Sequence, residues 1–181
     1  MGKKILWVTE TAIMLALLVT LQALTKGFGQ LVTGTFVNVV LAVSVLVGGW
    51  ATGLTVALVS PVLAFLLNIA PMALTVPAIM VGNTVYVLLL WLIVGKRYNS
   101  VVLRMIAWLA AAFAKFGTLY LIVVKLICGM LAPSLLASGI MKEPMLKALP
   151  ATFSYPQLIT ALIGGAVALV IVPGLRKALR R

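Results

Sequence analysis

The residues that could bind a solute are side-chain amides set in an otherwise apolar chain. Six of the seven amides fall in the half of the predicted membrane segments that faces away from the cytoplasm, and only Asn99 does not: Gln22, Gln30, Asn38, Asn68, Asn83 and Gln157. A side-chain amide in hydrocarbon is costly unless it is hydrogen-bonded. Six amides at one depth therefore indicate a polar pocket that opens outward, which is typical of a solute-binding membrane protein.

Lys115 carries the strongest single-residue signal. It lies eleven residues after Arg104 in an apolar segment, and therefore near the middle of the membrane. A lysine at that depth needs a partner, a water-filled cavity or loss of its charge. At about 100° per residue it shares a helix face with Trp108, Ala111, Thr118, Ile122, Lys125 and Gly129. Of these, Lys125 lies ten residues further on, which is about 15 Å further out.

Two interpretations of this lysine stripe remain open. In the functional one, Lys115 and Lys125 line a pocket for an anionic solute, such as a carboxylate or a phosphate. In the structural one, Lys125 extends its amine to the outer interface, while Lys115 donates hydrogen bonds to backbone carbonyls.

Four further polar residues are candidates for the same pocket. Asn83 and Tyr86 lie one helical turn apart, and an asparagine can both donate to and accept from a heterocycle or an amide. Ser154 and Gln157 flank Pro156 at the start of the last segment, where a proline in the first turn is tolerated. The alternative for each is a hydrogen bond between helices, which is common in membranes.

Composition places the chain in the membrane and excludes several kinds of site. Of the 181 residues, 64% are hydrophobic and only 9% are charged, whereas a soluble domain has about a quarter charged residues. With no histidine, one cysteine and two acidic residues, Glu10 and Glu143, the chain lacks the side chains for a metal cluster or a paired-carboxylate enzyme. It also lacks a P-loop sequence. We expect no catalytic residue, no cofactor and no metal.

Breaker residues divide residues 1–181 into six apolar segments that form one membrane domain. Their approximate ranges are 5–25, 34–48, 51–68, 75–95, 101–131 and 151–173, and the long link at 132–150 has room for a short surface helix. With the N-terminus inside, cytoplasmic segments hold nine lysines and arginines and outer loops hold three, which favours N-in, C-in. The net charge of +12 is then mainly an orientation signal, and we expect no nucleic-acid partner.

Several short motifs resemble those of a transporter family. They are Ala12-x-x-x-Ala16, Gly34-Thr-Phe-Val-Asn38, Gly49-x-x-x-Gly53 and Pro77-Ala-Ile-Met-Val-Gly-Asn83. With six segments in 181 residues, they make the chain similar to the substrate-binding S component of an energy-coupling factor (ECF) transporter. The resemblance implies that Ala12 and Ala16 dock on a transmembrane coupling subunit. It also implies that a solute binds in the outer half, between helices four to six and the outer loops, a region that holds Asn83, Tyr86, Lys115, Lys125, Ser154 and Gln157. Asn38 of the second segment is a further candidate.

The implied function is import across a prokaryotic plasma membrane. Two ATPase subunits would power uptake of a small metabolite, such as a vitamin or a vitamin precursor. One alternative is a solitary secondary carrier, although no membrane-embedded acidic residue beyond Glu10 is present for proton coupling. The other is a membrane scaffold of similar fold, which has little reason to gather amides and lysines at one depth.

Overall fold

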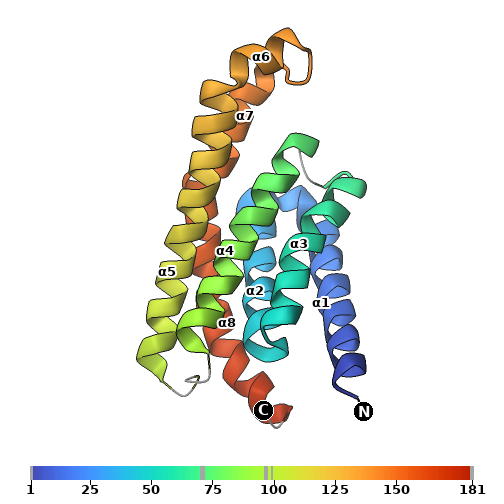
Figure 1. Ribbon diagram of the computed structural model, residues 1–181, viewed down its shortest axis with the longest axis vertical. Helices are drawn as coiled ribbons and strands as arrows, with labels where there is room; N and C mark the ends of the chain where they lie inside the picture. The colour runs from blue at the N-terminus through green and yellow to red at the C-terminus, as the bar shows by residue number, and fades with distance from the viewer. Residues whose placement is uncertain (1, 70–71, 96–97, 99, 180–181) are drawn as a thin grey trace.

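The chain forms an all-helical bundle in the computed structural model, which describes residues 2–69, 72–95, 98 and 100–179 (Figure 1). Two of the short helical elements are 3-10 turns and η3 is a π-helix. In chain order the elements are α1 Lys3–Thr25, η1 Lys26–Phe28, α2 Gln30–Gly48, α3 Trp50–Leu66, η2 Ala73–Thr75, α4 Val76–Val94, α5 Val101–Leu119, η3 Tyr120–Met130, α6 Ala132–Ala137, α7 Glu143–Phe153 and α8 Tyr155–Ala178.

The helices match the six predicted membrane segments. Five of the described helical stretches are long and apolar enough to cross a membrane, and α3 is a shorter apolar helix of 17 residues. Glycines with a positive φ, Gly29 at 84° and Gly49 at 88°, make the two tight turns that precede α2 and α3. The predicted fold class, an all-α integral membrane protein, is confirmed.

Helix α2 lies at the centre of the bundle and packs against α1, α3, α4 and α8. Its residues from Val40 to Val47 are all buried, so this stretch is surrounded by protein on every side. Helix α1 instead contacts the bundle along one narrow face, because its buried residues Thr11, Leu18 and Thr25 recur every seventh position. Most of the other described residues of α1, including Ala12 and Ala16, are exposed, and the remaining ones, such as Gln22, are half-buried.

The fifth segment and the link after it differ from the prediction. The stretch 101–130 is continuous, but α-helix gives way to the π-helix η3 at Tyr120. The link contains α6 and α7, and α7 packs along η3 rather than lying on a surface by itself (Figure 1). Val123 and Ile127 of η3 form a second apolar cluster with Leu149 and Phe153 of α7. This cluster holds the end of α7 against the bundle.

Close approach of α8 to α2 depends on Gly164. A Cβ atom at this position would lie 2.7 Å from the Thr35 carbonyl oxygen and 2.7 Å from the Asn38 Cβ. We expect Gly164→Ala to lower the free energy of unfolding by about 1–3 kcal/mol, because backbone atoms cannot move aside cheaply. Gly174→Ala in the same helix is the control, since its Cβ would meet nothing within 4 Å. Thermal unfolding in detergent measures both, and an equal effect of the two variants would contradict the packing argument.

The described ends of the chain, at the start of α1 and the end of α8, lie at the same end of the bundle (Figure 1). The N-in, C-in orientation remains a prediction, and four of its basic residues, Lys96, Arg97, Arg180 and Arg181, lie outside the described residues. In a Cys128→Ser background, a cysteine placed at Lys142 should react with an impermeant maleimide in intact cells, and one at Lys177 should not. The opposite labelling pattern would reverse the orientation.

Candidate functional site

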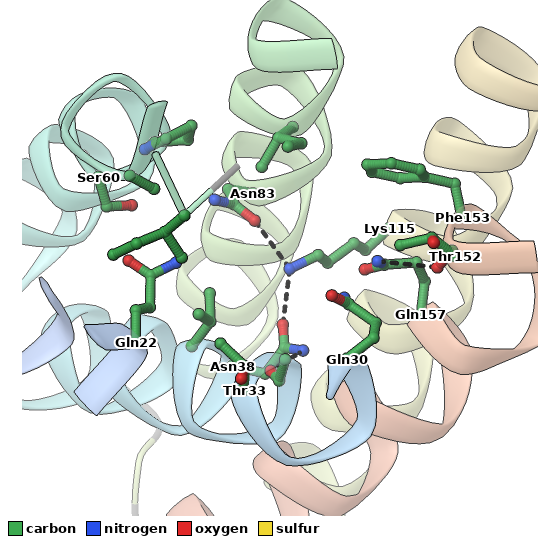
Figure 2. A pocket seen from close by; sticks show the side chains of 16 residues that line it. Gln22, Gln30, Thr33, Asn38, Ser60, Asn83, Lys115, Thr152, Phe153 and Gln157 are labelled. Carbon is green, nitrogen blue, oxygen red and sulfur yellow. Dashed lines mark hydrogen bonds between the residues drawn. The ribbon is translucent and has the colours of Figure 1, made fainter. Parts of the chain in front are cut away.

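A polar pocket lies inside the bundle (Figure 2). Its volume is about 110 Å³. The end of α1 and the start of α2, which contribute to its lining, lie in the half of the bundle away from the described chain ends (Figure 1). Side chains from α1, α2, α3, α4 and α5 line it, together with the junction of α7 and α8. The polar lining residues are Gln22, Gln30, Thr33, Asn38, Ser60, Asn83, Lys115, Thr152 and Gln157, and the apolar ones are Gly34, Val37, Pro61, Ala64, Ile69, Ile79 and Phe153.

Lys115 is the centre of this site. Its Nζ donates one hydrogen bond to Asn38 Oδ1 and another to Asn83 Oδ1, each 2.7 Å long (Figure 2). The side chain is only 2% exposed. These contacts join α5 to α2 and α4, so residues far apart in the chain meet at one amine. The interpretation in which Lys115 bonds backbone carbonyls is wrong, because its acceptors are the two side-chain amides.

The position of Asn38 is fixed by its own helix and by α8. Its Nδ2 donates to the Gly34 carbonyl at 2.9 Å and to Thr160 Oγ1 at 3.3 Å. With its nitrogen held in this way, Asn38 must turn its oxygen toward Lys115. Gly164 allows the approach of α8 that brings Thr160 within reach. The close packing of α2 on α8 therefore orients a pocket residue.

Tyr86 lies behind Lys115 and does not line the pocket. The Lys115 Nζ is 5.4 Å from the centroid of the Tyr86 ring, within the range of a cation–π contact. The ring is completely buried, and its hydroxyl has no hydrogen-bond partner. Tyr86 therefore supports the ammonium group from the protein side, rather than facing a ligand as its helix position suggested.

Lys125 lies outside the pocket, and the predicted lysine stripe does not continue past α5. Its side chain is exposed, with its Nζ 5.8 Å from the centroid of the Tyr120 ring. The predicted stripe assumed that the whole segment is an α-helix, but η3 is a π-helix. In a π-helix each hydrogen bond joins residues five apart, so each residue turns by a smaller angle about the axis than in an α-helix. The change in helix type turns Lys125 away from the face of Lys115.

Only one of the two candidate residues at the start of α8 lines the pocket. Gln157 lines the pocket, is 6% exposed, and its Nε2 donates to the Thr152 carbonyl at 3.2 Å. Ser154 does not line the pocket. It interrupts the helix between α7 and α8 with φ −100° and ψ −127°, and its carbonyl accepts the Gln157 backbone N–H. Ser154 thus forms a turn that places Gln157.

Several lining residues were not selected as site candidates from the sequence. Gln22 and Gln30 belonged to the outward group of amides, and that shared depth was the signal that could have identified them. Thr33, Ser60 and Phe153 gave no comparable signal. Asn68 belongs to the same amide group but does not line the pocket. Its backbone carbonyl accepts a hydrogen bond from the Lys26 Nζ at 2.6 Å. The pocket is therefore bounded by helices one to three as well as by four to six.

Gln22 has an unsatisfied polar atom at this site. Its Oε1 is buried and has no hydrogen-bond partner. Figure 2 shows Gln22 across the pocket from Gln157, with the Lys115 amine between them in this view. A buried acceptor without a donor costs free energy of about 1–3 kcal/mol. A ligand that supplies a donor would remove that cost.

The pocket has one formal positive charge and no negative one among the described lining residues. Lys115 is its only basic residue, and neither of the two acidic residues of the chain, Glu10 and Glu143, lines it. An ammonium group in a membrane interior is expensive without a counter-charge, even when neutral groups accept its hydrogen bonds. The positive charge of the pocket therefore favours a ligand that is anionic or has electron-rich atoms.

Six apolar helices of this arrangement define a multi-pass, all-α membrane protein. The family model described as "ECF transporter, substrate-specific component" matches residues 7–176. The chain belongs to this family of ECF transporter substrate-specific components, whose members are substrate-binding subunits of transporters. This confirms the resemblance inferred from the short motifs. Comparison with the curated proteins and with the solved structures gave no match.

Proposed function

We propose that the protein captures a small solute from outside a prokaryotic cell in the pocket around Lys115. The observation that carries this proposal is the buried Lys115 amine, held by Asn38 and Asn83 and facing a cavity instead of a counter-ion. Membrane proteins keep intramembrane charges mainly where they bind a substrate or lie on its pathway. The proposed binding residues are the amine and the side-chain amides that line the pocket, namely Lys115, Gln22, Gln30, Asn38, Asn83 and Gln157.

We also propose that this subunit works with an ECF module made of a transmembrane coupling subunit and two ATPase subunits. The chain has no P-loop sequence, so we assign ATP hydrolysis to the partner subunits. Family membership supports this assignment. The exposed small residues Ala12 and Ala16 on α1 allow another helix to approach closely, and they are the proposed contact with the coupling subunit.

Native mass spectrometry of the gently purified protein tests the proposal. We expect a bound small molecule on the subunit itself, and coupling and ATPase subunits in milder preparations. Gly174→Ala serves as a control that should leave both kinds of complex unchanged, because its Cβ meets nothing within 4 Å. A protein that never retains or binds a small molecule, although folded, would contradict the proposed function.

A further inference from the structure

We propose that the pocket selects a small organic monoacid: a solute with one carboxylate, an apolar body and one N–H or O–H donor. The inference rests on the proposed solute-binding function and adds the charge and shape of the solute. Four features of the pocket carry it, namely the geometry around Lys115, the absence of acidic lining residues, the unpaired Gln22 oxygen and the cavity size.

The first feature is the number of hydrogen-bond donors on Lys115. A lysine ammonium has three N–H groups. Two of them are used at 2.7 Å by the oxygens of Asn38 and Asn83, both neutral groups. The third has no acceptor among the described residues, and Lys115 lines the cavity. A carboxylate oxygen in the cavity would complete the set and supply the missing negative charge.

The second feature limits the net charge of the solute. A cation or a zwitterion would bring a positive charge into a pocket where no described lining residue is acidic. A dianion would leave one negative charge unpaired, because Lys115 is the only basic lining residue. Unpaired charge is costly at this depth. A monoanion alone leaves the occupied site neutral.

The third feature is the buried Gln22 Oε1, which has no hydrogen-bond partner. It lies away from Lys115, on the side of the pocket that Ser60 lines (Figure 2). A solute that places its carboxylate at Lys115 and an N–H or O–H group at Gln22 satisfies both ends of the pocket. Val37, Ile79 and Phe153 are among the apolar residues that line the space for its body.

The fourth feature is the volume of about 110 Å³. This is well below the volume of about 300–1,000 Å³ of pockets that hold drug-sized ligands. The space therefore suits a small solute. The same limit excludes a large, multi-ring solute from this conformation of the pocket.

Retention of solutes from a mixture tests whether the pocket selects a monoanion. The purified protein in lipid nanodiscs is incubated with a small-molecule extract of bacterial cells, washed and then denatured, and the released solutes are identified by mass spectrometry against a heat-unfolded blank. We expect a small monocarboxylic acid. A retained cation, zwitterion, dianion or uncharged solute overturns this inference but leaves the proposed function standing. If no solute is retained, the proposed function fails and the inference fails with it.

A second measurement compares the retained acid with its carboxamide. On the wild-type protein we expect the carboxamide to bind at least about 10-fold more weakly, because it cannot pair with the ammonium charge. On Lys115→Met the acid and its carboxamide should bind within about 2-fold of each other. The substitution and the change of carboxylate to carboxamide each remove the same contact, that between the ammonium group and the carboxylate. Equal binding to the wild-type protein would overturn the inference, and it is the result expected if Lys115 is an uncharged amine. That comparison needs no variant, so it decides the question even if Lys115→Met fails to fold.

Gln22→Met tests the other end of the pocket. It should weaken binding of the retained acid by about 3- to 10-fold, the effect of one neutral hydrogen bond. An analogue of the acid with its donor methylated should not distinguish Gln22→Met from the wild-type protein. If Gln22→Met binds the acid as tightly as the wild-type protein does, the proposal that the solute carries an N–H or O–H donor for Gln22 is wrong.

Discussion

Lys115→Met is expected to weaken binding of the co-purifying solute by about 10-fold or more. The substitution keeps the apolar stem and removes the ammonium group that Asn38 and Asn83 hold. A hydrogen bond to a charged group contributes about 1.5–3 kcal/mol, which corresponds to a 10- to 150-fold change in affinity. Isothermal titration calorimetry on the purified protein measures the dissociation constant directly.

Lys125→Met is the matched control for this experiment. It removes the same charge from the same helical rod, ten residues further on, but from an exposed side chain outside the pocket. We expect its affinity to stay within about 2-fold of the wild-type value, because surface charges contribute at most about 1 kcal/mol and are screened by salt. A folded Lys115→Met protein with unchanged affinity would make Lys115 a structural residue that joins α2, α4 and α5.

Ala16→Trp is expected to abolish transport while leaving solute binding intact. Ala16 and Ala12 lie on the exposed part of α1, one turn apart, where a small side chain permits close contact with another helix. A tryptophan there would hold the coupling subunit away from α1. Uptake of radiolabelled solute by cells that express the whole transporter measures the loss, which we expect to exceed 10-fold.

Val170→Trp provides the comparison for this variant. Val170 on α8 is 80% exposed, so a larger side chain there meets lipid instead of protein and should leave uptake unchanged. Co-purification separates the possible causes, because Ala16→Trp should lose the coupling subunit and retain the solute. Loss of solute binding in an assembled complex would show that α1 acts on the pocket and not on the partner.

The sequence by itself determined the features that depend on local chemistry. Hydropathy and breaker residues predicted six apolar segments, because each membrane helix must satisfy its own backbone. The cost of intramembrane polar groups identified Lys115 and the outward group of amides as the candidate site. Asn38, Asn83, Lys115 and Gln157 do line the pocket. The size and spacing of Ala12 and Ala16 predicted a close contact with another helix, and the structure shows that both residues are exposed on α1.

The tertiary structure decided which polar residues face each other. A sequence gives the depth of a residue but not the rotation of its helix, so Gln22 and Gln30 joined the lining only when α1 and α2 were packed together. Tyr86 lies behind Lys115 because the α4–α5 contact fixes which side of each helix turns inward.

Helix type and helix breaks account for the remaining differences. Lys125 turned outward because η3 has π-helical geometry, which no periodicity at 100° per residue can anticipate. Ser154 became a turn between α7 and α8, and the packing of α7 on η3 brought Phe153 into the pocket. Rotation, helix type and close contact between helices are properties of the assembled bundle. Only the packed structure could therefore place the amine of Lys115 between two particular amides.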